Sequence, residues 1–138
     1  MYKTLFWTGD ACGQLHLLDQ TRLPIHVENT ICMTVDDVWN AIRVLKVRGA
    51  PAIGVAAAYG LVLGLQSSRG AAINEFLADV DRVALYLSTS RPTAVNLFWA
   101  LNRMKAVARE AGPTSTTECH DRLFAEARQI EVEDQAMC

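Results

Sequence analysis

The chain has 138 residues, a length that fits one domain with a core of its own. Its 13 basic and 15 acidic residues give a net charge of −2, which argues against a basic nucleic-acid-binding face and against a patch for anionic membranes. The first residues lack the apolar run of a secretory signal, and the four cysteines lack the close pairs of a zinc site. We therefore expect a cytoplasmic protein with reduced thiols and without a zinc site.

Residues 1–32 predict a small antiparallel sheet. Three short segments are β-prone or alternate with a period of two: residues 4–7, 15–19 and 25–29. A turn signal at Gly9-Asp10 separates the first two, and Pro24 separates the second from the third. Tight connections of this kind are typical of three adjacent antiparallel strands.

Residues 33–138 predict about five helices. Thr34 and Asp37 have the spacing of a capping box, as do Ser115 and Glu118, so a helix is expected after each. Apolar residues recur at helical spacing in both segments and in three others, from about residue 50 to 66, 71 to 87 and 92 to 108. The expected fold class is α+β, mainly α: one domain with a three-stranded sheet followed by a helical bundle.

The stretch from Ala50 to Ser68 contains no charged residue and is built largely from alanine and glycine. An uncharged run of this length approaches the ~20 apolar residues of a membrane span. Against a span, the run contains Pro51 and three glycines and ends in polar residues. The prediction favoured is a buried helix without membrane association, whose small side chains let neighbouring backbones come close.

At two places in the sequence, an arginine lies shortly before a proline that can begin a helix. The first is Arg48-Gly49-Ala50-Pro51, and the second is Arg91-Pro92-Thr93. Free N–H groups and the positive end of the helix dipole attract anions at such starts. Two guanidinium groups there would fit a phosphate monoester, although most arginines in proteins simply lie on the surface.

Three segments in this order carry a resemblance to a known family: Leu18-Asp19-Gln20-Thr21-Arg22-Leu23-Pro24, Val47-Arg48-Gly49-Ala50-Pro51-Ala52-Ile53-Gly54 and Arg91-Pro92-Thr93-Ala94-Val95-Asn96-Leu97. Together they resemble methylthioribose-1-phosphate isomerase of methionine salvage. The resemblance implies the conversion of 5-methylthioribose 1-phosphate into 5-methylthioribulose 1-phosphate, without metal or nucleotide. It also implies that Arg48, Gly49, Ala50 and Arg91 bind the sugar phosphate.

The same resemblance implies that the catalytic residues are not in these 138 residues. The family's catalytic cysteine and aspartate belong to a Rossmann-like C-terminal domain, and none of Cys12, Cys32, Cys119 and Cys138 stands in the catalytic context. The expectation is a truncated, N-terminal part of the isomerase that binds phosphate and is inactive alone. A face left without its neighbouring domain would be apolar, so a homo-oligomer is expected.

Two other functions remain open from the sequence. The family is similar to the regulatory subunits of the translation-initiation guanine-nucleotide exchange factor, which would make the chain an assembly module. It is also similar to ribose-1,5-bisphosphate isomerase, which would change the sugar. The segments RGAPAIG and RPTAVNL look more like the methylthioribose branch. Sugar-phosphate binding, and the group preferred on the sugar, would separate the three.

Overall fold

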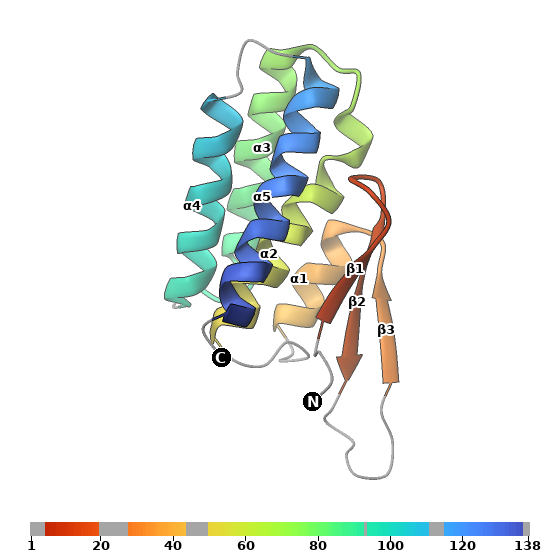
Figure 1. Ribbon diagram of the computed structural model, residues 1–138. Helices are drawn as coiled ribbons and strands as arrows, with labels where there is room; N and C mark the ends of the chain where they lie inside the picture. The colour runs from red at the N-terminus through yellow and green to blue at the C-terminus, as the bar shows by residue number, and fades with distance from the viewer. Residues whose placement is uncertain (1–4, 20–27, 44–49, 93, 111–114, 137–138) are drawn as a thin grey trace.

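A computed structural model describes residues 5–19, 28–43, 50–92, 94–110 and 115–136. A three-stranded sheet is followed by five α-helices and one short 3-10 helix, which confirms the predicted α+β class (Figure 1). The elements are β1 (Leu5–Thr8), β2 (Gln14–Asp19), β3 (Glu28–Cys32), α1 (Val35–Arg43), α2 (Ala50–Gly64), η1 (Gln66–Ser68), α3 (Ile73–Ser88), α4 (Val95–Glu110) and α5 (Thr116–Ala136).

The sheet is an antiparallel meander in the order β1-β2-β3. Because side chains alternate across a strand, one face is apolar and buried: Leu5, Trp7, Leu15, Leu17 and Cys32. On the opposite face the rings of Phe6 and His16 stack with centroids 4.6 Å apart. The third strand, expected at residues 25–29, is found at residues 28–32, and residues 25–27 lie outside the described part of the chain.

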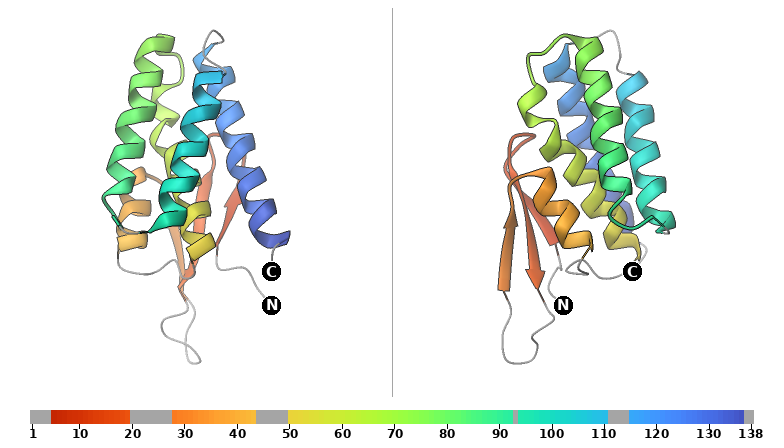
Figure 2. Two further views of the ribbon diagram at one scale, coloured as in Figure 1. Left: turned by 90° about the vertical axis from the view of Figure 1, so that its left-hand side faces the viewer. Right: turned by 180° about the vertical axis from the view of Figure 1, so that it is seen from behind.

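Helix α2 is the centre of the bundle, and α1, α3, α4 and α5 all pack against it. The sheet lies on the side of α1, and α4 lies on the opposite side of the molecule (Figures 1 and 2). Nearly every described side chain of α2 is buried, including the ring of Tyr59. No helix in the described ranges combines the length and the apolar character that crossing a membrane would require. The prediction of a buried central helix is confirmed.

Three glycines on two faces of α2 allow this central position. A Cβ atom on Gly60 would lie 2.9 Å from Cγ1 of Val38 on α1, and one on Gly64 would lie 2.8 Å from Cγ1 of Val83 on α3. A Cβ atom on Gly54 would lie 3.0 Å from the backbone oxygen of Asn96 on α4. Each glycine therefore sits where a neighbouring helix comes too close for a larger residue.

Both predicted capping sequences begin helices. At α1 the Thr34 hydroxyl accepts from the Asp37 N–H at 3.2 Å, and the Asp37 carboxylate accepts from the Thr34 N–H at 3.3 Å. At α5 the Ser115 hydroxyl accepts from the Glu118 N–H at 3.1 Å. These bonds satisfy backbone donors that a helix start leaves without an internal partner.

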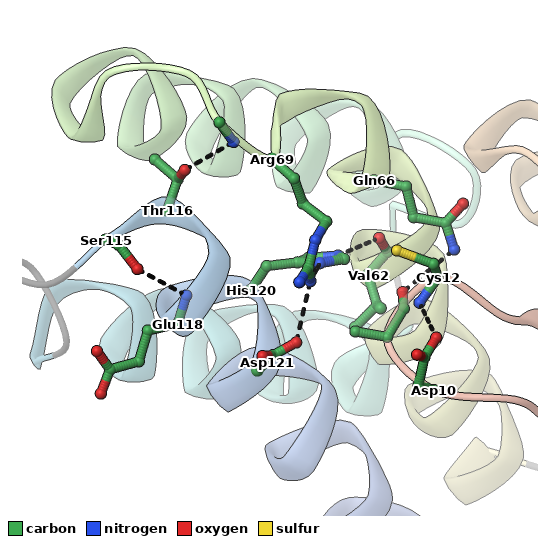
Figure 3. A network of polar contacts seen from close by, with 12 residues as sticks. Asp10, Cys12, Val62, Gln66, Arg69, Ser115, Thr116, Glu118, His120 and Asp121 are labelled. Carbon is green, nitrogen blue, oxygen red and sulfur yellow. Dashed lines mark hydrogen bonds and ion pairs between the residues drawn. The ribbon is translucent and has the colours of Figure 1, made fainter.

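A polar network joins the last turn of α2, the loop after η1 and the start of α5 (Figure 3). His120 is fully buried; its Nε2 lies 2.9 Å from the Val62 carbonyl oxygen, and its Nδ1 lies 2.7 Å from a guanidinium nitrogen of Arg69. Arg69 also pairs with Asp121 at 2.9 Å. Since the guanidinium can only donate, Nδ1 must accept and Nε2 must carry the proton donated to Val62. The imidazole is therefore neutral in this arrangement.

Helix α5 is less solvated than its charge-rich sequence suggests. The Glu131 carboxylate is buried and accepts from the Tyr59 hydroxyl, while Trp7 stacks on the Tyr59 ring. Burial and the hydrogen bond to Glu131 raise the pKa of Tyr59 above its ordinary value. The charge-rich segment of residues 118–134 is therefore not wholly solvated, because tertiary contacts pair the charges that face α2 and α4.

Candidate functional site

The candidate site lies where three helix ends meet. Helices α2 and α4 begin, and α5 ends, at the lower end of the molecule in Figure 1, and both views in Figure 2 show the same grouping. Between these ends is a pocket of about 350 Å³. Its lining residues are Gly54, Val95, Asn96, Trp99, Ile130, Glu133 and Asp134.

The wall of the pocket is mainly apolar. Val95 and Trp99 belong to one face of α4 and are 78% and 51% exposed, values that are high for large apolar side chains. Gly54 contributes no side chain, so α2 stays close to the first turn of α4. The result is an open apolar surface beside two helix starts.

Arg103 pairs with a carboxylate at the rim of the pocket. This guanidinium donates to Glu126, and to the two carboxylate oxygens of Glu133 at 2.8 and 2.7 Å. It also lies over the Trp99 ring, 5.4 Å from the centroid. Arg103 therefore ties α4 to α5 and orders two residues of the lining at once.

The two carboxylates of the rim have pKa values shifted in opposite directions. Hydrogen bonds from Arg103 lower the pKa of Glu133 to about 2. Burial, and to a lesser degree the charge of Glu131, raises the pKa of Asp134. At neutral pH the Glu133 carboxylate is thus firmly ionised, and its charge is matched by the guanidinium.

We expect the substitution Arg103→Met to raise the pKa of Glu133 from about 2 towards its ordinary value of 4.5. Because the folded pKa is lowered, the ionised Glu133 stabilises the fold above pH 4.5, and this stabilisation is lost as pH falls towards 2. The stability of the variant should therefore depend less on pH between 4.5 and 2. A carboxyl-carbon NMR titration of Glu133 measures the shift directly. The control is Arg109→Met, because Arg109 is an exposed arginine of the same helix that pairs with Asp81. An unchanged Glu133 titration in Arg103→Met would contradict the pairing.

The structure describes two of the four predicted substrate-binding residues. Ala50 is the first residue of α2, although its side chain is outside the description, and Arg91 is half-buried in the turn before α4. Arg48 and Gly49 lie outside the described residues, so the predicted closeness of the Arg48 and Arg91 side chains is not tested. Ala50 begins α2 and Arg91 lies in the turn before α4, and both helices begin at the end of the bundle where the pocket lies (Figure 1).

The predicted start of the fourth helix is wrong by three residues. Helix α4 begins at Val95, and Pro92 is part of a preceding turn in which the Arg91 carbonyl accepts from the Ala94 N–H at 3.0 Å. The Ala94 carbonyl is the first acceptor of the helix, from the N–H groups of Leu97 and Phe98. A proline fixes its own φ but does not oblige the next residues to be helical. Arg91 therefore lies one turn ahead of the helix.

Sequence reasoning missed most of the pocket lining. Neither Trp99 nor Glu133 was among the residues predicted to bind the substrate. The spacing of Val95 and Trp99 places them on one side of a helix, which is a usable signal. Nothing in the sequence indicates that the end of α5 completes the pocket, because that depends on how α5 packs against α2 and α4.

The fold is that of a known family. The model of the Initiation factor 2 subunit family matches residues 46–138, and the chain belongs to this family. It is 53% identical over 129 residues to 5-deoxyribose 1-phosphate isomerase of Bacillus thuringiensis (strain Al Hakam), covering 94% of this chain and 36% of that protein. It is 50% identical over 134 residues to methylthioribose-1-phosphate isomerase of Pelotomaculum thermopropionicum, covering 97% of this chain and 36% of that protein.

Two solved structures are similar at 34% identity over 96% of this chain. One is 5-methylthioribose 1-phosphate isomerase from Pyrococcus horikoshii OT3, with a TM-score of 0.86 and 36% of that chain covered. The other is the delta subunit of translation initiation factor eIF-2B from A. fulgidus, with a TM-score of 0.85 and 37% covered. The resemblance to the isomerase family is confirmed, and this chain spans little more than a third of the length of these relatives.

Proposed function

We propose that this chain is the phosphate-binding part of an aldose–ketose isomerase that acts on a ribose 1-phosphate modified at C5. The substrate suggested by the sequence is 5-methylthioribose 1-phosphate, converted into 5-methylthioribulose 1-phosphate in methionine salvage. The phosphate is bound at the starts of α2 and α4 by Arg48, Gly49, Ala50 and Arg91. The observation that carries the proposal is that α2 and α4 begin at the same end of the bundle (Figure 1), with Arg91 in the turn before α4.

Charge and backbone geometry support phosphate binding at this end. A helix start presents backbone N–H groups and the positive end of the helix dipole, and two helices begin beside one pocket. Arg91 lies in the turn directly before α4, where a guanidinium adds a charged fork to those donors. The relatives named as sugar 1-phosphate isomerases, at 50% and 53% identity, supply the class of ligand.

We expect Arg91→Ala to weaken the binding of 5-methylthioribose 1-phosphate by about 10- to 100-fold, the usual effect of removing a charge-assisted hydrogen bond. Isothermal titration calorimetry of the 138-residue chain measures it. The matched control is Arg82→Ala, an exposed arginine of α3 whose partner is Asp79, and it should bind as the parent chain does. Equal affinities for the two variants would contradict a role for Arg91.

The rate of isomerisation depends on groups acting at C1 and C2 of the sugar, and phosphate binding alone does not provide them. We therefore propose that the 138 residues bind the sugar phosphate without turning it over. Incubation of the purified chain with 5-methylthioribose 1-phosphate, followed by proton NMR, should show no ketose product. Steady formation of 5-methylthioribulose 1-phosphate would contradict this division of roles.

A second function is supported by the family description and by the likeness to an initiation-factor subunit. In that case the chain would be an assembly module, and the exposed apolar residues of α4 would contact another protein. The two structural likenesses are equally strong, so the shape of the domain does not separate the functions. Binding of a sugar 1-phosphate favours the isomerase. Its absence, together with association with initiation-factor subunits, favours the assembly module.

A further inference from the structure

Residues 66–71, which comprise η1 and the loop after it, are bonded to three neighbours. We refer to them as the post-α2 segment. The Gln66 amide donates to the carbonyl oxygens of Ala11 and Gly13 in the turn between β1 and β2, at 3.2 and 2.9 Å. The Ser68 hydroxyl donates to the Asp79 carboxylate of α3 at 2.7 Å. The third neighbour is the start of α5, at the end of the bundle opposite to the pocket (Figure 1).

Arg69 and Gly70 join the post-α2 segment to α5 (Figure 3). One guanidinium nitrogen of Arg69 lies 2.7 Å from Nδ1 of His120 and 2.9 Å from the Asp121 carboxylate. The Gly70 N–H donates to the Thr116 hydroxyl at 2.8 Å. Histidine is the side chain whose ordinary pKa brings a change of charge between pH 5 and 8, so His120 is the member of this contact that responds to mild acid.

The bond between Arg69 and His120 exists only while the imidazole is neutral. A guanidinium has no acceptor, so Nδ1 of His120 must accept with its lone pair. Protonation places a hydrogen on Nδ1, and two donors then face each other at 2.7 Å. Nε2 cannot offer a lone pair in exchange, because it already donates to the Val62 carbonyl oxygen at 2.9 Å. A proton on this imidazole therefore breaks the bond to Arg69.

The other neighbours of His120 do not oppose its protonation in this way. The carboxylates of Asp121, on the same helix, and of Asp10, in the turn between β1 and β2, both favour the charged imidazole. Helix α2 presents a backbone carbonyl, and α3 presents the Phe76 ring, which meets the imidazole edge-on with centroids 6.3 Å apart. Burial, and to a lesser degree the Arg69 charge, lower the pKa of His120. Among these neighbours, only the guanidinium is repelled by a charged imidazole.

We propose that Arg69 and His120 form a pH-sensitive latch: protonation of His120 in mild acid releases the post-α2 segment from α5, while its bonds to the sheet turn and to α3 remain. The bond from Gly70 to Thr116 involves the next residue along the chain, so it opens with the latch. The change is local, which distinguishes it from unfolding of the whole domain. It does not depend on the proposed function, because no residue of the latch lines the pocket.

Amide hydrogen exchange of the 138-residue chain, measured by NMR at pH 7.5 and at pH 5.5, tests the latch. Gly70 is the reporter, since its N–H donates across to Thr116 on α5. Ser68 is the internal control, because its N–H donates to the Leu65 carbonyl at 3.0 Å, a bond that the latch does not involve. After correction for the intrinsic exchange rate at each pH, we expect the protection factor of Gly70 to fall about tenfold more than that of Ser68.

Two substitutions assign the effect to the contact between Arg69 and His120. His120→Gln keeps a donor for the α2 carbonyl and an acceptor for the guanidinium but does not titrate, so the protection of Gly70 should no longer depend on pH. Arg69→Met removes the guanidinium, so Gly70 should already be less protected at pH 7.5 and should change little in acid. The matched control is Arg109→Met, which replaces an exposed arginine of α4 and should behave as the parent chain does.

Three outcomes would overturn the latch. An unchanged protection factor at Gly70 would show that acid does not release the segment. An equal fall at Gly70 and Ser68 would show that acid opens the domain as a whole. Persistence of the pH effect in His120→Gln would assign it to another group. If His120→Gln does not fold, the comparison of Gly70 with Ser68 in the parent chain and in Arg69→Met decides the question.

Discussion

Substituting Gly60 with leucine is expected to lower the free energy of unfolding by about 3 kcal/mol, at the upper end of the usual cost of overpacking. Gly60 is in the middle of α2, and even a Cβ atom there would lie 2.9 Å from Val38 and 3.4 Å from Leu87. The added side chain must push α1 and α3 away from α2. Because a domain of this size is stable by only about 5–15 kcal/mol, the loss is a large fraction of the total.

Urea denaturation followed by circular dichroism measures this effect. The control is Ala78→Leu on the exposed side of α3, where the same leucine meets solvent and helix propensity changes little. It should unfold within about 0.5 kcal/mol of the parent chain. Equal stability of Gly60→Leu and the parent chain would show that the helices do not pack as closely as described.

The second large effect is a loss of stability in mild acid caused by His120. Burial lowers the pKa of this imidazole, the hydrogen bond to Val62 acts in the opposite direction, and the charge of Arg69 lowers the pKa further. The other charged groups that affect it are Asp121 on α5 and Asp10 in the turn between β1 and β2, and both raise the pKa. Protonation would put a hydrogen on Nδ1, which faces the Arg69 guanidinium at 2.7 Å.

The pKa of His120 is lower in the folded chain than its ordinary value of 6.5, so the unfolded chain binds the proton more readily. The contribution of the neutral, hydrogen-bonded imidazole to stability is fully present above pH 6.5 and is lost as pH falls from there towards the pKa of the folded chain. Over that window we expect the free energy of unfolding to fall by up to about 1.4 kcal/mol per pH unit.

His120→Gln provides the comparison, because its amide can still donate to the Val62 carbonyl and accept from Arg69 but does not titrate. Denaturation curves at several pH values between about 7.5 and 5 should show a shallower loss of stability in this variant than in the parent chain. His16, which is partly exposed on the sheet, serves as the control when replaced in the same way. Parallel pH profiles for the parent chain and His120→Gln would show that the buried histidine does not cause the loss of stability in acid.

The sequence by itself determined the features that depend on local chemistry. The β-prone segments at residues 4–7 and 15–19, the capping pair Thr34 and Asp37 and the uncharged run from Ala50 predicted the sheet and two helices. These predictions hold because strand propensity, helix capping and an uncharged run are each set by residues that lie close together in the sequence. The three segments of the resemblance, in their order along the chain, led to the correct family. Where local signals competed, as at Pro92, the helix start was misplaced.

Only the tertiary structure decided which distant residues share a site. The pocket exists because α2 carries no side chain at Gly54, so that α4 can approach it, and because α5 ends beside them. The pairing of Arg103 with Glu126 and Glu133, and of Tyr59 with Glu131, joins residues whose separation in sequence carries no helical or strand period. Such contacts follow from the packing of whole helices, and packing is a property of the assembled core that no single segment specifies.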